Sequence, residues 1–263
     1  MMKTYIKNAT IFYLLSRNAL KITLQGRMGV IFFLLGKIIR VLFIFAFLAL
    51  VFNRTRLVKG YNFEQILVFF LTFNIIDTLG QILYRQVYRF RPLVVSGGFD
   101  MVLLKPIHPF IRILLGGVDF LDVLLVIPYF FVTFFIFAKM EISSFHMFLY
   151  LLLIINSMVM VTGFHISILA LGIATTEVDH TIMIYRDLSA MGRFPMNIYK
   201  EPVRGFFTYI IPVSLMMNVP AQAILGLATP WFILFSLLIS LGLLCLSLLF
   251  WDYALKRYQS WGG

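Results

Sequence analysis

The chain has 263 residues, of which 61% are hydrophobic and only 13% are charged, and its mean hydropathy is +0.96. About a quarter of the residues in a soluble domain are charged, so this composition predicts an integral membrane protein. The net charge of +11 does not by itself indicate a nucleic-acid partner, and we expect none, because membrane proteins concentrate Lys and Arg beside anionic lipid.

The apolar runs are long and continuous, which predicts an all-α bundle, because backbone groups in hydrocarbon must find their hydrogen bonds within each spanning segment. A β-barrel would instead show many alternating segments of about ten residues. We expect one membrane domain over residues 1–263 and no cleavable signal, since Lys3 and Lys7 are mixed into apolar residues at the N-terminus. The single cysteine, Cys245, excludes an intrachain disulfide and argues against a thiolate metal site.

Residues 1–28 carry a basic amphipathic pattern. From Lys3 to Gln25, basic and amide side chains fall on one side of a helix, and apolar side chains fall largely on the other. This pattern predicts a helix that lies in the cytoplasmic membrane interface. A cytosolic helix packed on a partner is the alternative.

Six membrane spans are predicted from the remaining apolar runs, because about twenty apolar residues cross the hydrocarbon. The predicted spans are residues 29–51, 61–83, 113–138, 145–174, 205–229 and 230–252. Pro212 and Pro220 divide the fifth run, so a span followed by a short re-entrant piece fits it better than one continuous helix. Two long polar connections, residues 85–112 and 175–204, separate the spans.

The distribution of basic residues predicts which side of the membrane each connection faces. If both termini are cytoplasmic, the terminal segments and the two long connections hold sixteen Lys and Arg residues, and the other loops hold four. The positive-inside rule therefore places both termini and both long connections in the cytoplasm.

Several polar side chains interrupt the predicted spans. In the second span, Asn74, Asp77, Gln81 and Arg85 recur at three- or four-residue spacing and make one polar stripe. Asp119 and Asp122 lie near the start of the third span. Polar side chains at this depth face other helices or a cavity, so they either hydrogen-bond between helices or line a translocation path. In the first span, Lys37 and Arg40 either reach toward the cytoplasmic interface or bind an anionic group of a substrate.

No constellation of residues indicates an enzyme. The motifs GxxxxGK[ST] and HExxH are absent, so the sequence has neither a phosphate-binding loop for ATP nor a zinc protease site. The nearest approach to a catalytic set is Glu177, Asp179, His180 and Asp187, which fits a solvated surface better. His165 fits a hydrogen-bonded core histidine. We expect no catalytic residue, no metal and no cofactor on this chain.

The connection at 85–112 contains a candidate docking surface. Gly97 and Gly98 precede an apolar ridge formed by Phe99, Met101, Leu103 and Leu104. A short helix parallel to the membrane, which presents this ridge to the groove of a soluble partner, has such a composition. A helix that rests among lipid headgroups has it too.

Three motifs, in this order, resemble the ABC-2 type permeases. They are SGGFD with LLKPIHP at 96–109, GRFP at 192–195 followed by PVR at 202–204, and IPV at 211–213 followed by Pro220-Ala221. The likeness is closer to the six-span bacterial subgroup often described as uncharacterised or daunorubicin-type permease components. With the span count, it extends over nearly the whole chain.

The resemblance implies a transmembrane subunit of an ABC exporter in a bacterial cell membrane. It would pair with a second copy or a related permease, and with separate ATPase subunits that bind ATP and Mg. The implied coupling helix comprises Ser96, Gly97, Gly98, Phe99, Asp100, Leu103, Leu104, Lys105 and Pro106. A second cytoplasmic contact would involve Arg193, Pro195, Tyr199 and Arg204, and an extracellular gate would lie near Pro212, Asn218 and Pro220.

The cargo of such an exporter would be amphipathic, lipid-like, a drug or a peptide. A charge placed in the ridge, as in Leu103→Asp, would then uncouple ATP hydrolysis from transport. Two other functions stay open. One is an ion-coupled transporter that uses Asp77, Asp119 and Asp122 as a relay, although the two halves of the sequence show no internal repeat. The other is a membrane protein that does not transport, such as an immunity or assembly factor.

Overall fold

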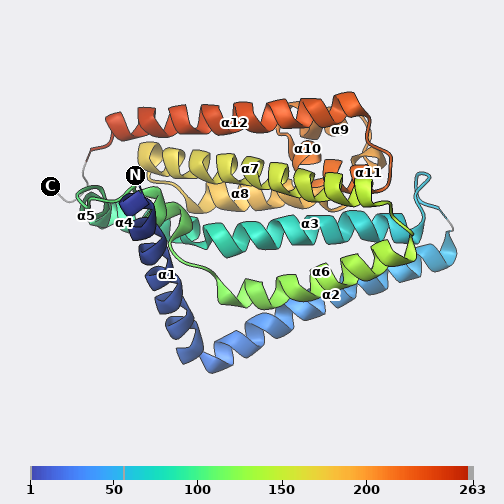
Figure 1. Cartoon of the computed structure of the whole chain (residues 1–263), viewed down its shortest axis with the longest axis horizontal. Coiled ribbons are helices and arrows are strands. Elements are labelled where there is room, and N and C mark those ends of the chain that lie inside the picture. The colour runs from blue at the N-terminus through green and yellow to red at the C-terminus, as the bar shows by residue number, and fades with distance from the viewer. Residues whose placement is uncertain (1, 56, 260–263) are drawn as a thin grey trace.

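The computed structural model describes residues 2–55 and 57–259, and of residues 2–6 and 27 only the backbone. Apart from an isolated bridge between Val58 and Tyr61, the regular structure of this part of the chain is helical. The long helices lie side by side along the longest axis of the molecule, and α1 (Met2–Gln25) crosses one end of them (Figure 1). The prediction of an all-α fold is confirmed.

Five helical stretches in the described residues are long and apolar enough to cross a membrane. They are α2 (Arg27–Arg54), α3 (Phe63–Tyr84) continued by η1 (Arg85–Arg89) and α4 (Phe90–Val95), α6 (Phe120–Lys139), α7 (Ser144–Thr175) and α12 (Pro230–Lys256). The most buried of the five is the stretch formed by α3, η1 and α4, whereas α2 has no buried residue in its most apolar window. The core therefore forms around α3 and α7, and α2 packs on its outside (Figure 1).

Polar side chains explain where these helices begin. The Asn62 side chain accepts a hydrogen bond from the backbone N–H of Gln65, and the Gln65 side chain accepts one from the N–H of Asn62. This reciprocal pair satisfies two N–H groups that would otherwise lack partners at the start of α3. Asp119, Ser143 and Thr229 accept similar bonds at the starts of α6, α7 and α12.

The third predicted span begins later than we expected. Residues Ile111–Leu115 form one π-helical turn, and α6 follows only after Gly116 and Gly117, whose φ angles are 50° and 111°. A Cβ on Gly117 would lie 2.9 Å from the carbonyl oxygen of Leu15, so a glycine is needed where α1 crosses this segment. The backbone N–H of Val118 also donates to the Ser16 hydroxyl of α1, at 3.2 Å.

The largest difference from the sequence prediction lies between α7 and α12. The described elements are α8 (Asp179–Ala190), η3 (Met191–Arg193), η4 (Met196–Ile198), α9 (Val203–Gly205), η5 (Phe206–Ile210), α10 (Val213–Met217) and α11 (Val219–Ile224). No helix in 205–229 is long enough to cross a membrane, so the predicted sixth span is not found there. Pro212 and Pro220 interrupt this segment, as the sequence suggested.

The segment 175–204 runs through the bundle instead of staying at one end. Tyr185 of α8 packs edge to face against His165 of α7, with ring centroids 5.0 Å apart. Farther along, Asn197 donates to the Tyr61 hydroxyl at 3.1 Å, beside the start of α3. The predicted placement of the whole segment at the same end as 85–112 is therefore wrong, because packing against α7 and α3 carries it to the opposite end.

This path changes the distribution of basic residues. Arg186 and Arg193 line a cavity within the bundle, and Arg204 lines a pocket with Lys59 at the end opposite α4. Without the four basic residues of 175–204, the predicted cytoplasmic count of Lys and Arg falls from sixteen to twelve. Lys200 and Arg204 raise the predicted count for the other side from four to six. The charge difference is smaller than predicted but keeps its sign.

Candidate functional site

The first candidate site is a turn at the end of the bundle, formed by α4 and α5 (Gly98–Leu103), which we call the α4–α5 turn. Gly97 joins the two helices with a φ of 70°, a conformation that glycine adopts without strain. A Cβ on Gly98 would lie 3.1 Å from a methyl carbon of Leu93. The paired glycines therefore allow the two short helices to pack closely.

Phe99 fixes this turn to the bundle. Its side chain is fully buried among Phe90, Trp251 and Tyr258, with ring centroids 5.2, 6.4 and 5.1 Å away. The prediction that Phe99 belongs to an exposed ridge is therefore wrong, because the chain reversal at Gly97 turns its ring toward α12. Leu103 is also partly buried against the core.

Two apolar side chains of the α4–α5 turn face outward. Met101 is 66% exposed and Leu104 is 79% exposed. Ser96, Lys105 and Pro106 are exposed beside them, and Asp100 is partly exposed. Of the residues predicted to form the coupling helix, Leu104 offers the largest accessible apolar side chain, and it stands on a turn whose position is fixed.

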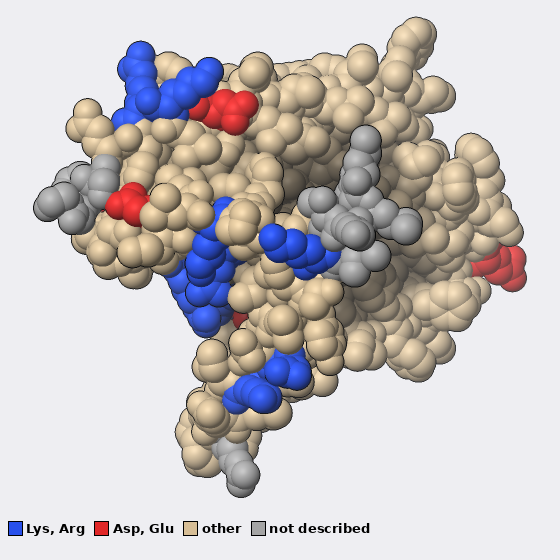
Figure 2. All heavy atoms as spheres, turned by 60° about the vertical axis from the view of Figure 1, so that its left-hand side comes forward, with Lys and Arg blue, Asp and Glu red and all other residues tan. Residues whose placement is uncertain are grey.

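Ion pairs connect the α4–α5 turn to the start of α8. Arg91 lies 3.6 Å from a Glu177 oxygen and 3.4 Å from an Asp179 oxygen, and the His180 imidazole hydrogen-bonds to Glu177 at 3.0 Å. The bond from His180 and the charge of Arg91 hold the pKa of Glu177 below its usual range. Three members of the predicted acid–histidine set thus meet on the surface, while Asp187 lies farther along α8. On this face, Lys and Arg cover more of the surface than Asp and Glu (Figure 2).

The second candidate site is a polar cluster inside the bundle. The Lys37 ammonium of α2 forms an ion pair with Asp122 of α6 and donates to the Gln81 side chain of α3 at 3.3 Å. The Gln81 amide in turn donates to Asp77 at 2.7 Å. Asn74 lines a narrow cavity with Lys37, Asp77 and Gln81, and its side-chain amide donates to the Phe70 carbonyl at 2.7 Å.

Asp119 does not join this cluster. It caps the start of α6, and its carboxylate lies 3.4 Å from the Arg85 guanidinium. The stripe predicted along the second span is therefore one side of a real cluster, while its partner Lys37 comes from another helix. Sequence reasoning also missed Arg186 and Arg193, because we placed them in a connection outside the bundle.

The residues predicted to make a second cytoplasmic contact do not form one surface. Arg193 lies over the Phe73 ring at 5.0 Å within the bundle, and Pro195 is buried. The Tyr199 hydroxyl donates to the Met191 carbonyl at 3.1 Å. Arg204 lies at the end opposite the α4–α5 turn, so the four positions share no common partner surface.

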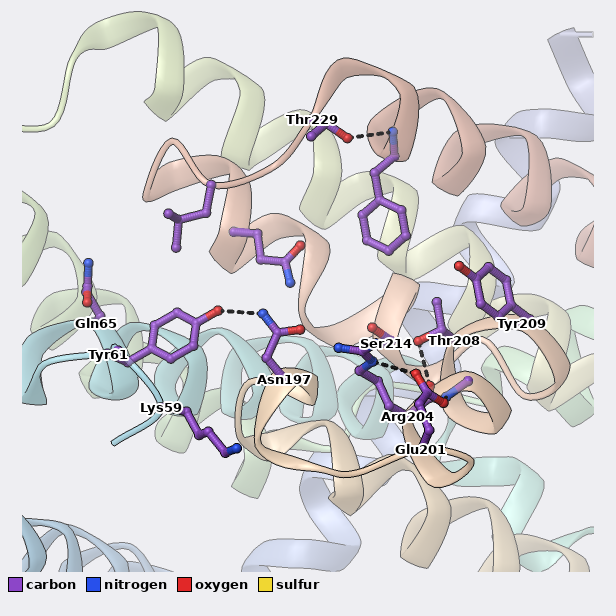
Figure 3. A pocket seen from close by; sticks show the side chains of 15 residues that line it. Lys59, Tyr61, Gln65, Asn197, Glu201, Arg204, Thr208, Tyr209, Ser214 and Thr229 are labelled. Carbon is purple, nitrogen blue, oxygen red and sulfur yellow. Dashed lines mark hydrogen bonds and ion pairs between the residues drawn. The ribbon is translucent and has the colours of Figure 1, made fainter. Parts of the chain in front are cut away.

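Arg204 lines a cavity of about 540 Å³ at that opposite end (Figure 3). Its guanidinium donates to Glu201 at 2.8 Å, and Glu201 also accepts from the backbone N–H of Gly205 at 3.0 Å. These two donors hold the pKa of Glu201 below its usual range. Across the cavity, Tyr61 and Asn197 are hydrogen-bonded to each other (Figure 3).

The predicted gate residues lie between this cavity and the bundle. Asn218 is fully buried, donates to the Gly192 carbonyl at 2.8 Å and accepts from the Met196 N–H at 2.7 Å. Pro212 precedes α10 and Pro220 lies in the first turn of α11. Asn218 therefore satisfies backbone groups that the break after η3 leaves without helical partners.

Comparison with known families identifies the chain. A family model described as ABC-2 family transporter protein matches residues 38–262, which reach from α2 past the end of α12. Neither a curated protein nor a solved structure gave a match. Because the model covers most of the sequence, the chain belongs to the ABC-2 family, whose members are membrane subunits of transporters.

Proposed function

We propose that this chain is the permease subunit of an exporter driven by a separate ATPase. It moves an amphipathic, lipid-like, drug or peptide cargo outward across a bacterial cell membrane, and the partner chain binds ATP and Mg. Family membership and the five apolar helices support a multi-pass transport subunit. The excess of basic residues at the end that holds the α4–α5 turn favours a cytoplasmic position for that end and for both termini.

The observation that carries the docking proposal is the pair of exposed apolar side chains on the α4–α5 turn. Large apolar side chains exposed next to charged ones are typical of protein-binding surfaces. Met101 and Leu104 have this setting, between the Arg91 ion pairs and Lys105. An ATPase that presents an apolar cleft with an acidic rim would fit this surface.

The anchoring of Phe99 suggests how movement is transmitted. Its ring contacts Phe90 in the stretch that continues α3, and Trp251 in α12. When ATP closes the ATPase pair, the α4–α5 turn would move as a rigid lever, and α3 and α12 would move with it. The coupling is reciprocal for binding, so cargo should alter nucleotide affinity.

A second permease copy, or a related permease, would complete the path. The outer face of α2 is apolar and exposed, including Phe32, Phe43 and Phe47. Such a face meets lipid or another membrane helix. The ion-coupled alternative has little support, because Asp122 and Asp119 are already paired with Lys37 and Arg85.

The test is co-purification of the tagged chain with its ATPase in mild detergent. We expect the Leu104→Asp variant to weaken ATPase binding about tenfold or more, since a charge would enter an apolar contact. Leu227→Asp, at an exposed leucine before α12 at the opposite end, is the matched control and should bind normally. If the chain is repeatedly isolated without an ATPase, or if both variants bind equally well, the docking proposal is wrong.

A further inference from the structure

Three arginines from separate elements line one cavity within the bundle. Arg40 comes from α2, Arg186 from α8 and Arg193 from η3, and the cavity they share has a volume of about 240 Å³. Its other lining residues are Phe73, Asp77, Met183, Asp187 and Ala190. The arrangement exists because α8 and η3, which follow each other in the chain, bring Arg186 and Arg193 to the same cavity as Arg40 of α2.

Among the described residues, none of the three arginines of this cavity forms a close ion pair with a carboxylate. Arg193 lies over the Phe73 ring, and the charges of Arg186 and Arg193 act on Asp77 at longer range. The two carboxylates at the cavity are Asp77, which accepts from Gln81, and Asp187. Three guanidinium groups therefore share two carboxylates, which leaves the lining of the cavity with an excess of positive charge.

The excess positive charge is costly because the cavity lies at membrane depth. Arg40 lies near the middle of Met28–Arg54, and Phe73 and Asp77 lie well inside the stretch Phe63–Val95. Charged side chains at such depth are expensive and normally pair with one another. The neighbouring Lys37 does so with Asp122, which shows that the bundle can supply a partner where it needs one.

The surroundings favour a ligand that has an apolar part. Met183 lines the cavity and is exposed, and so are its neighbour Ile184 and the α2 side chains Ile39 and Phe43. An acyl or other apolar chain could lie along this face while its head group reaches the arginines. Guanidinium groups bind phosphate and carboxylate in a planar, two-bond geometry, which suits such a head group.

We propose that the cavity lined by Arg40, Arg186 and Arg193 binds the anionic head group, a phosphate or carboxylate, of an amphiphilic molecule that the permease moves. This rests on the proposed transport function, which it narrows from amphipathic cargo in general to anionic amphiphiles. Neutral amphiphiles lack the group that would neutralise the guanidinium charges.

The test measures ligand binding to the purified full chain in a non-ionic detergent, from the dose-dependent rise in its unfolding temperature. The probes are oleoyl lysophosphatidate, the neutral 1-oleoylglycerol with the same chain, and glycerol 3-phosphate as the head group alone. We expect oleoyl lysophosphatidate to bind most tightly. Arg40→Gln and Arg186→Gln should each weaken that binding about tenfold, and Lys at either position should weaken it less than Gln does.

Arg257→Gln is the matched control, because Arg257 lies on the Tyr253 ring beyond this cavity and should leave binding unchanged. Arg40 and Arg186 are exposed, so their variants should fold even if Arg193→Gln does not. Equal binding of 1-oleoylglycerol, or binding that is insensitive to both arginines, would overturn the proposal. If glycerol 3-phosphate bound as tightly as oleoyl lysophosphatidate, the cavity would be a site for free anions, and the proposal of an amphiphilic ligand would be wrong.

The outcome is separable from the proposed function. ATPase co-purification is measured on the same preparations, without any probe. An arginine-dependent binding site in a chain that binds no ATPase would refute the exporter and keep the site. If the permease bound its ATPase but showed no preference for anionic probes, the exporter proposal would stand and the proposed anion site would be wrong.

Discussion

The α4–α5 turn and the polar cluster of the bundle both contain side chains in unfavourable surroundings. In the turn apolar side chains are exposed, and in the cluster charged side chains lie at membrane depth. At the turn, Leu104 and Met101 are exposed although their burial would be favourable. Beside the polar cluster, Arg40 and Arg193 line its cavity at membrane depth, where a charged side chain is costly. Each region also contains residues whose placement is favourable and which hold the region in position. In the turn this is the buried apolar ring of Phe99, and in the cluster it is the ion pair between Lys37 and Asp122. The comparison separates residues that build a region from residues that are free to meet something else.

The largest expected effect on stability belongs to the buried residue of the turn. Phe99→Ala removes a fully buried ring and should lower the free energy of unfolding by about 3–5 kcal/mol. Leu104→Ala should change it by less than about 0.5 kcal/mol, since its side chain is exposed, yet should weaken ATPase binding. Unfolding in denaturant and co-purification measure the two effects. If Leu104→Ala destabilised the chain as much as Phe99→Ala does, the turn would be ordinary core.

The second-largest effect on the free energy of unfolding should come from the ion pair of the polar cluster. Lys37→Met leaves the Asp122 carboxylate buried without a partner, and Lys37 itself is only 26% exposed. We expect a loss of about 2–4 kcal/mol, and a partial recovery in the double variant Lys37→Met with Asp122→Leu. The control is Lys139→Met, which breaks the exposed pair with Glu64 and should cost less than about 1 kcal/mol. Equal losses for Lys37→Met and its control would show that the cluster does not support the fold.

Asn218 sharpens the comparison, because it is a buried polar residue with both hydrogen-bonding groups satisfied. Asn218→Ala leaves the Gly192 carbonyl and the Met196 N–H without their partner, which should cost about 1–3 kcal/mol. Asn197→Ala, which removes one bond at an exposed position, should cost less than about 1 kcal/mol. Thermal unfolding of both variants in the same detergent measures the difference. No difference would mean that the break after η3 is held by other contacts.

The long helices could be predicted from the sequence because their signals are local. Runs of apolar residues set their lengths, and capping residues such as Asn62 and Thr229 set their starts. Asn74, Asp77 and Gln81 recur at helical spacing, so the stripe they form could also be read directly. Its partner on α2 could not, because which helix packs opposite a stripe depends on tertiary structure.

The position of α8 in the bundle could not be predicted from local sequence signals. Its twelve residues include Asp179, His180, Arg186 and Asp187, so they resemble a surface connection. The segment lies in the bundle because Tyr185 packs on His165 and because Asn218 satisfies the backbone where the helix ends. His165 itself is buried and hydrogen-bonded to the Val161 carbonyl at 2.8 Å, as we predicted. The inward direction of Phe99 was missed because periodicity does not extend across the reversal at Gly97.

The smallest effect, and the one that depends on pH, concerns Glu177 beside the α4–α5 turn. Its pKa is held below the ordinary value of 4.5, first by the hydrogen bond with His180 and then by the charge of Arg91. A lowered pKa in the folded state stabilises the fold above the unfolded pKa, and this contribution is lost as the pH falls through the folded value. Glu177→Gln should therefore cost a little stability at neutral pH and nothing once the pH has fallen below the folded pKa. Glu201→Gln should give the same pH profile, because its pKa is lowered by Arg204 and Gly205, but only Glu177→Gln should weaken ATPase docking. A stability loss in Glu177→Gln that persists at low pH would show that its role is packing, and equal docking by both variants would place the ATPase away from the Arg91 ion pairs.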